Sequence, residues 1–213
     1  MIKAVAAALM VIDHIGYIFF PDMLIWRLIG RLSMPLFAYG IAKGYEYSRQ
    51  KGTLWKYFWK LILFSAVSQF PFFLMAGEGE NIGLTWAFSL LLLMIAGRRD
   101  ISRPRAALEC LGVLAAAYIL NVNYGIYGVL MPSAMGTQKG YSRMFLYTVI
   151  LWGLYVLMNG AGGMIQVAAC AAVPVLAVLK MQDEKIRLPR SFFYVFYPAH
   201  ILILLMIKQF LFL

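Results

Sequence analysis

Long apolar stretches alternate with short polar connections along the whole chain. The apolar stretches predict helices near residues 3–20, 24–44, 55–76, 82–97, 104–121, 124–137, 141–159, 163–180 and 191–212. Most of these helices approach about 20 residues, the length that crosses the hydrocarbon core of a bilayer. The sixth is shorter and contains Pro132, so we expect it to be tilted or to cross only half of the membrane. The pattern predicts an all-α fold, a polytopic transmembrane helix bundle of about nine spans.

The composition excludes an ordinary soluble domain. Of the 213 residues, 63% are hydrophobic and 13% are charged, whereas a soluble domain is roughly half apolar and about a quarter charged. Nine spans with short loops use the whole length, so we predict a single integral-membrane domain over residues 1–213. We expect the first stretch to be an uncleaved span, because Asp13 and His14 interrupt it and no small-residue cleavage site follows at the expected place.

The polar connections fall into two kinds that alternate along the chain. The basic kind comprises KGYEYSRQKGTLWKYFWK, GRRDISRPR, TQKGYSR and KMQDEKIRLPR, and the other kind comprises PDM, GEGEN, NVN and NGAGG. Because cytoplasmic loops are rich in Lys and Arg, we expect the basic loops and the N-terminus inside and the C-terminus outside. The net charge of +10 then reflects topology and does not indicate a nucleic-acid partner. An additional reading is that some basic loops attract a phosphate-bearing cosubstrate.

The first predicted hairpin carries four ionisable residues that are costly in lipid unless they are paired or hydrated, namely Asp13, His14, Arg27 and Arg31. Asp13 and Arg31 are equally far along the chain from Asp22 in the turn, so an antiparallel hairpin places them at one depth. Arg27 and Arg31 are four residues apart and therefore share a helix face. The sequence predicts a buried Asp13–Arg31 pair beside the imidazole of His14.

The chain has only two histidines, His14 and His200, and both fall within predicted spans. A lone histidine on an apolar helix is often a buried structural residue, and that reading stays open. Burial disfavours the imidazolium whereas a carboxylate such as Asp13 favours it, so a neutral imidazole that acts as a base is the functional hypothesis. No metal site is expected, because Cys110 and Cys170 lie in separate apolar stretches without metal-ligand spacing.

Further polar residues gather at the outer ends of the predicted spans. They are Ser68, Gln69, Asn81, Thr85, Asn121, Asn123, Tyr124 and Tyr127. Each could simply cap a helix or lie at the membrane interface, but together they predict a polar cavity open toward the outer face. Glu109 lies four residues after Arg105 and is expected to pair with it on one helix face.

Six motifs give the chain a resemblance to a known family. They are LMVIDHIGYIFFPD, IGRLSMPLFAYGIAKGYEYSR, SQFPF, NIGLTWAFSLLLL, NYGIYGVL and FYVFYPAHILIL. In this order they resemble the TraX family of integral-membrane acetyltransferases, and through it the larger group of polytopic membrane acyltransferases. The resemblance covers nearly the whole chain. It implies transfer of an acetyl group from acetyl-CoA to an amine or hydroxyl acceptor at the outer side of a bacterial cytoplasmic (inner) membrane.

If the chain carries out this reaction, its polar residues suggest the following hypothesis for individual roles. We expect His14, oriented by Asp13, to act as general base and Arg31 to stabilise the oxyanion. His200 is expected either to position the thioester or to carry the acetyl group transiently. The expected acceptor-binding residues are Arg27, Gln69, Asn81, Thr85, Asn123, Tyr124 and Tyr197, and the expected acetyl-CoA-binding residues are Arg98, Arg99, Arg103 and Arg105. The acceptor can be a peptide amine, a sugar or a small molecule.

The chain departs from the family pattern at three places. Gln69 stands where the pattern usually has Glu, Phe72 or Phe73 where it has Asp, and Asn123 where it has Asp. If those acids bind an acceptor amine, the acceptor of this chain differs or its activity is lost. Two other functions remain open from the residues alone: a small proton-coupled transporter or flippase, and a structural subunit in which the Asp13–Arg31 pair fixes helix packing.

Overall fold

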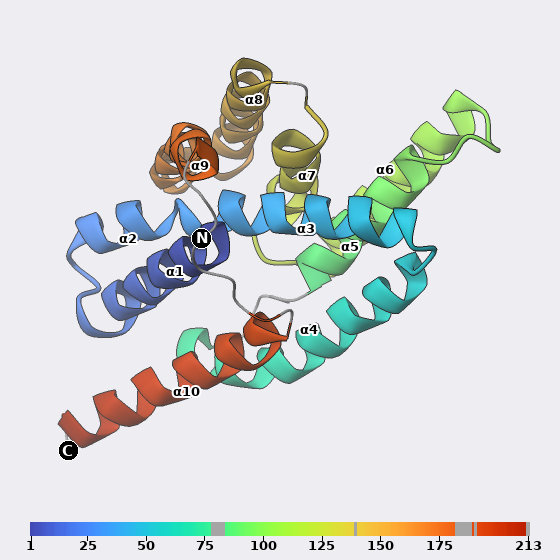
Figure 1. Ribbon diagram of the computed structural model, residues 1–213. Helices are drawn as coiled ribbons and strands as arrows, with labels where there is room; N and C mark the ends of the chain where they lie inside the picture. The colour runs from blue at the N-terminus through green and yellow to red at the C-terminus, as the bar shows by residue number, and fades with distance from the viewer. Residues whose placement is uncertain (78–83, 139, 182–188, 190, 212–213) are drawn as a thin grey trace.

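The computed structural model describes residues 1–77, 84–138, 140–181, 189 and 191–211, and within these residues the protein is all-helical, without a strand (Figure 1). The α-helices are α1 (Ile2–Phe19), α2 (Leu24–Gly30), α3 (Ser33–Gln50), α4 (Leu54–Ala76), α5 (Leu84–Ala96), α6 (Arg103–Ile119), α7 (Gly125–Gly136), α8 (Tyr141–Asn159), α9 (Ala172–Met181) and α10 (Phe192–Leu211). A 3₁₀-helix, η1 (Gly160–Ala171), joins α8 to α9. The predicted all-α fold is confirmed.

The second predicted span is divided, which corrects the expectation of one helix over residues 24–44. α2 ends at Gly30 and α3 begins at Ser33. Proline has no N–H, so Pro35 cannot donate to the carbonyl of Arg31, as the i→i−4 bond of a continuous helix requires. The helix breaks just there, and Arg31 lies at the break. The other predicted helices begin and end within three residues of the observed ones, although η1 replaces the first part of the eighth.

Four helical segments of the described residues are long and apolar enough to cross a membrane: α1, α4, α10 and the run Tyr141–Met181. Large apolar side chains such as Leu63, Phe70 and Phe210 are exposed, as expected of a surface that lipid covers. The chain is therefore a helical membrane protein. The helix lengths do not support the predicted count of nine spans or the N-inside, C-outside orientation, and α2, with 7 residues, is too short to cross a bilayer.

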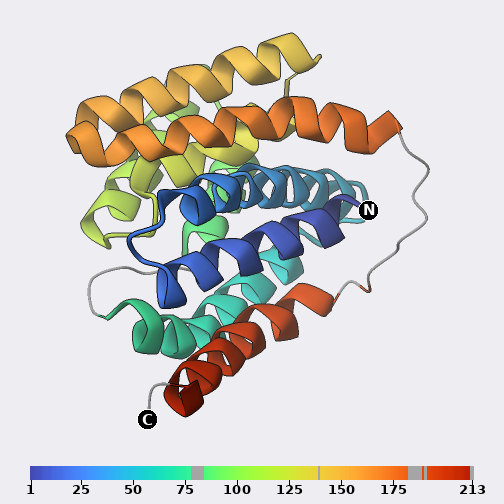
Figure 2. The same cartoon turned by 90° about the vertical axis from the view of Figure 1, so that its left-hand side faces the viewer.

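The helices stack in layers, as Figure 2 shows. α8, η1 and α9 form one side, α1 and α3 lie in the middle, and α4 and α10 pack against each other on the other side. α8 and η1 pack together across a turn at Gly160, where φ is 60°. α7 lies between α3 and α8 and contacts both. The middle layer therefore contacts elements from both ends of the sequence.

The core forms where α3, α7 and α9 meet. Leu36, Met131 and Leu176 from these helices are completely or almost completely buried. Close approach of α3 and α7 depends on small residues, since a Cβ added at Gly136 would overlap Ala42. α1 packs against α2, α3 and α10. As a result, α1 contacts both the helices that directly follow it in the chain and the last helix, α10.

Candidate active site

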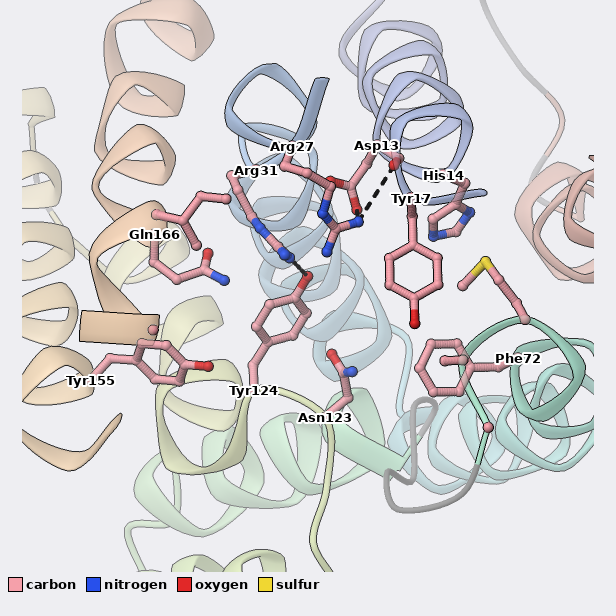
Figure 3. A pocket seen from close by; sticks show the side chains of 15 residues that line it. Asp13, His14, Tyr17, Arg27, Arg31, Phe72, Asn123, Tyr124, Tyr155 and Gln166 are labelled. Atoms are coloured by element: carbon pink, nitrogen blue, oxygen red, sulfur yellow. Dashed lines mark hydrogen bonds and ion pairs between the residues drawn. The ribbon is translucent and has the colours of Figure 1, made fainter. Parts of the chain in front are cut away.

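A cavity of about 340 Å³ lies where the C-terminal half of α1 meets α2, the end of α4, the start of α7, the end of α8 and η1. Its labelled side chains in Figure 3 are Asp13, His14, Tyr17, Arg27, Arg31, Phe72, Asn123, Tyr124, Tyr155 and Gln166. This volume is near the lower end of the range for small-molecule sites. The structure thus brings polar residues from α1, α2, α8, η1 and the start of α7 together around one hollow, with α4 contributing apolar residues.

Asp13 forms an ion pair with Arg27 at this cavity. Nη1 of Arg27 lies 3.0 Å from Oδ2 of Asp13 (Figure 3). The pair joins α1 to α2, and the same guanidinium lies over the ring of Tyr17, 5.0 Å from its centroid. The sequence predicted that Asp13 pairs with Arg31, and the structure corrects this: the ion-pair partner is Arg27.

Arg31 points toward α7 instead. Its Nη1 donates to the hydroxyl of Tyr124 at 2.6 Å (Figure 3), and the guanidinium lies 5.6 Å from the centroid of that ring. Tyr124 has a φ of 61° at the start of α7, and the turn before it is held by Thr85, whose hydroxyl donates to the carbonyl of Asn123 at 2.8 Å. Arg31 forms no ion pair with the described residues, so its direct partner is the neutral hydroxyl of Tyr124.

The two histidines of the chain form a direct hydrogen bond. Nδ1 of His14 and Nε2 of His200 are 2.7 Å apart, and both side chains are buried. Nδ1 of His200 bonds to the backbone carbonyl of Phe196 at 2.8 Å. We expected Asp13 to orient His14, but within the described chain the bond to the His14 ring comes from His200. The structure therefore links the first helix to the last one through two imidazoles.

Tyr197 holds the two imidazole rings edge-on. Its ring centroid lies 6.1 Å from that of His14 and 5.6 Å from that of His200, at interplanar angles of 78° and 74°. Tyr197 is not among the residues that line the cavity. Its position indicates a packing contact behind the histidines rather than a contact with a ligand in the cavity.

Only some of the other predicted acceptor-binding residues line the cavity. Asn123 and Tyr124 line the cavity, as does Phe72, one of the positions where the family pattern usually has an acid. Thr85 is buried and does not line the cavity, and its hydroxyl donates to the backbone carbonyl of Asn123. Gln69 is half-buried on α4 and does not line the cavity. Asn81 lies outside the described residues.

The predicted acetyl-CoA-binding arginines lie elsewhere. Arg98, Arg99, Arg103 and Arg105 are exposed around the start of α6, at the opposite end of α5 from Thr85, and none of them lines the cavity. Arg105 pairs with Glu109 at 3.0 Å, as predicted from their spacing. Nη2 of Arg98 lies 2.7 Å from Oδ2 of Asp100, and this hydrogen bond lowers the pKa of the Asp100 carboxyl below its ordinary value.

Three polar residues of the cavity were not predicted: Tyr17, Tyr155 and Gln166. Tyr17 follows Asp13 by four residues, so the helical period already places the two on one face. Gln166 is a buried amide in an apolar stretch, and its Oε1 has no hydrogen-bond partner among the described residues. The spacing of Tyr17 from Asp13 and the position of Gln166 in an apolar stretch could both have been read from the sequence. Among the described residues there is also no group of three or more His, Cys, Asp or Glu residues that could hold a metal ion.

Comparison with known proteins shows to which family the chain belongs. The model of the family described as TraX protein matches residues 1–208. This chain belongs to the TraX family. The resemblance inferred from the sequence motifs is confirmed. No solved structure matches the chain.

Three relatives of this TraX-family chain span different shares of its length. It is 27% identical to the probable fimbrial assembly protein FimC, serogroup H1, of Dichelobacter nodosus, over 99% of this chain and 95% of that protein. It is 27% identical to protein TraX of Escherichia coli, over 96% of this chain and 84% of that protein. A shorter match, 44% identical over 18% of this chain and 16% of the other, is to the uncharacterized protein RP591 of Rickettsia prowazekii (strain Madrid E).

The motifs that indicated the TraX family meet at the cavity. The first motif, LMVIDHIGYIFFPD, supplies Asp13 and His14, and the motif that begins IGRLSMPL supplies Arg31. The NYGIYGVL motif supplies Asn123 and Tyr124, and the last-helix motif supplies His200 behind His14. The arrangement places a possible base beside two guanidiniums in a buried, polar hollow. Chemically, such a set can remove a proton from a nucleophile and stabilise an oxyanion.

Proposed function

We propose that this protein is a membrane acetyltransferase that moves an acetyl group from acetyl-CoA to an amine or hydroxyl acceptor. The observation that carries the proposal is that His14, Arg27 and Arg31 line one buried cavity. Membership of the TraX family, which is associated with acetylation of pilin, supports acyl transfer as the reaction class. The family match does not favour the alternative of a proton-coupled transporter or flippase.

In the proposed reaction His14 accepts the proton of the acceptor N–H or O–H group. The freed electron pair attacks the carbonyl carbon of the thioester, and the carbonyl oxygen becomes an oxyanion that the Arg31 guanidinium stabilises. When the intermediate collapses, the C–S bond breaks and the CoA thiolate takes the proton back from His14. The products are the acetylated acceptor and CoA. A positioned base contributes about 10²–10⁴-fold to such a step.

The ion pair between Asp13 and Arg27 supports this assignment of charge. Asp13 forms its direct ion pair with Arg27 at 3.0 Å, so the two guanidiniums of the cavity share one carboxylate and Arg31 lacks an ion pair of its own within the described residues. A preorganised cation is most effective where negative charge develops during the reaction. We propose that the acceptor contacts Arg27, Asn123 and Tyr124. Thr85 instead fixes the backbone at Asn123 through a hydrogen bond, and Tyr197 packs edge-on against His14.

The donor is proposed to arrive from the opposite end of the bundle. The exposed arginines around the start of α6 attract the phosphates of acetyl-CoA from the cytoplasm, and the thin pantetheine arm passes between the helices to the cavity. α5 has 13 residues, which corresponds to about 20 Å of helix, so the arm has to cover roughly that distance. This path requires that the start of α6 faces the cytoplasm and that the protein lies in the bacterial cytoplasmic membrane.

One assay tests the proposal. The purified full chain in detergent is given radiolabelled acetyl-CoA together with a crude envelope extract as the source of acceptors, and release of free CoA and transfer of label are measured. Transfer by the wild type and its loss in His14→Ala are expected. Asp22→Asn, which alters an exposed residue of the loop after α1, is the control. Normal turnover by folded His14→Ala would remove His14 from the reaction, and liposome uptake without CoA release would support a carrier instead.

A further inference from the structure

We propose that His200 fixes the tautomer of His14, so that His14 presents an unprotonated Nε2 to the cavity and acts as base through that atom. The inference deepens the proposed function and rests on it for its catalytic meaning. It is carried by the hydrogen-bond chain from the carbonyl of Phe196 through His200 to His14. His200 is thereby a positioning residue, which acts on the reaction only through another side chain.

The hydrogen-bond chain begins with a group that can only accept. The carbonyl oxygen of Phe196 lies 2.8 Å from Nδ1 of His200. A carbonyl oxygen has no proton to donate, so the proton of this bond is on Nδ1 of His200. Neutral imidazole has a single N–H. Nε2 of His200 is therefore the acceptor nitrogen of that ring.

The tautomer of His14 follows from this acceptor. Nδ1 of His14 lies 2.7 Å from Nε2 of His200, so His14 must donate from Nδ1. The single N–H proton of the neutral His14 ring is then on Nδ1, and Nε2 of His14 keeps its lone pair. Neutral rings fit their surroundings, because the cavity already holds two guanidiniums, Arg27 and Arg31, against the one carboxylate of Asp13. A further buried positive charge would lack a partner.

The ring geometry matches an edge-to-edge bond between the imidazoles. The planes of His14 and His200 are 4° apart and their centroids are separated by 4.9 Å, so the two bonded nitrogens lie between the rings. The ring of Phe196 also stacks on His200, with centroids 5.0 Å apart and planes 10° apart. Tyr197 meets both imidazoles edge-on. These contacts restrict rotation of either ring away from the bond.

The remaining nitrogen of His14 faces the reaction space. His14 lines the cavity and His200 does not, so the Nδ1 edge of His14 points away from the cavity toward α10. Figure 3 shows one ring nitrogen of His14 turned toward the cavity and the other turned away from it. Among the described residues no hydrogen bond to Nε2 of His14 is formed. Nε2 is thus the atom that would accept the proton of the acceptor.

The same geometry favours positioning over acetyl carriage by His200. Both of its nitrogens are engaged, one by Phe196 and the other by His14. A covalent carrier would need a bare nitrogen directed at the thioester. His200 also replaces Asp13 as the residue expected to orient His14, because the carboxylate of Asp13 pairs with Arg27. When Nε2 of His14 takes up a proton, the bond from Nδ1 to His200 becomes charge-assisted and stronger.

Nitrogen NMR tests the tautomer directly. The full chain, labelled with ring-¹⁵N histidine in detergent, contains only two imidazoles, and the variants His14→Gln and His200→Gln assign them. The expected wild-type spectrum has protonated Nδ1 and bare Nε2 in both rings. In His200→Leu, His14 is expected to lose this fixed state and exchange between tautomers, whereas Leu204→Ala, a buried control on α10, retains it. A wild-type His14 with its proton on Nε2 would overturn the inference.

Kinetics of the same variants separate positioning from covalent carriage. The amide oxygen of His200→Gln can accept from Nδ1 of His14, so we expect kcat to fall by no more than about tenfold. His200→Leu offers no acceptor, and we expect kcat to fall by about 10²–10⁴-fold with little change in KM for acetyl-CoA. If His200→Gln keeps the tautomer but is as inactive as His200→Leu, His200 reacts itself and the inference is wrong. A wild type with the expected tautomer but without acetyl transfer would instead refute the proposed function alone.

Discussion

The backbone of Gly30 lies directly against the side chain of Asp13, so closely that a Cβ added to the glycine would overlap it. α2 can therefore approach α1 only because residue 30 has no side chain. The contact is next to the ion pair between Asp13 and Arg27, which means that the packing of a single glycine determines whether the pair can form.

Gly30→Ala is expected to destabilise the protein by about 1–3 kcal/mol, the usual cost of forcing an extra methyl group into a packed site. Because α2 must move away from α1, acetyl transfer is expected to decrease as well. Thermal unfolding in detergent measures the effect. Gly40→Ala is the matched control, since a Cβ at this exposed position on α3 meets no atom within 4 Å and alanine favours helix. Equal destabilisation by both variants would show that the Gly30 contact is unimportant.

Removing one partner of the Asp13–Arg27 pair is expected to be costlier than removing both. Asp13→Asn or Arg27→Gln leaves a mostly buried charge without its counterion, which costs about 3–5 kcal/mol. In the double variant neither member of the pair remains charged, so part of the loss should be recovered. A double-mutant cycle of unfolding free energies measures the coupling. Additive losses would indicate that the two groups do not interact in the folded protein.

Tyr124→Phe is expected to lower the rate of acetyl transfer by about tenfold. The hydroxyl of Tyr124 accepts from Nη1 of Arg31 at 2.6 Å, and a hydrogen bond to a charged group contributes about 1.5–3 kcal/mol. Without it the guanidinium is no longer held in one orientation. Tyr118→Phe, at an exposed position on α6, controls for loss of a hydroxyl. A kcat of Tyr124→Phe equal to that of the wild type would exclude this role.

Arg99→Gln combined with Arg103→Gln tests the proposed entry of acetyl-CoA. Both residues are exposed near the start of α6, and replacing them leaves the ion pairs of Arg98 and Arg105 intact. We expect a higher KM for acetyl-CoA with unchanged kcat, and a smaller difference from the wild type at high salt, where charges are screened. Lys208→Gln, near the end of α10, is the control. A KM that is unaffected at low salt would contradict entry from this side.

Much of the helical architecture could be predicted from the sequence, because apolar stretches and charged connections mark where helices begin and end. The division of the second span is an instructive failure. Pro35 signalled it, but the apolar pattern continues on both sides of the proline and suggested one helix. The predicted number of membrane spans is not supported for a similar reason. An apolar stretch can be buried inside the protein or can contact lipid, and the sequence pattern does not distinguish between the two.

The site was predictable where neighbouring residues form it and not where distant ones do. The hairpin argument located Asp13, His14, Arg27 and Arg31 correctly around one place, but chose the wrong partner for Asp13. It assumed two straight helices of equal length, whereas α2 ends at Gly30 and leaves Arg27 opposite the carboxylate. The bond between His14 and His200 joins residues 186 positions apart. No local pattern encodes such a contact, which depends on how α1 and α10 pack.

The size of the cavity limits what can react there. About 340 Å³ is far too little for an entire nucleotide-bearing thioester plus a macromolecule, so only the tip of each substrate can enter. An acceptor would have to offer its nucleophile on a slender, projecting end, such as a chain terminus or a primary alcohol. Longer fatty acyl groups would compete with that end for the same space. Under the proposed function, this volume would select for short acyl donors and sterically unhindered nucleophiles.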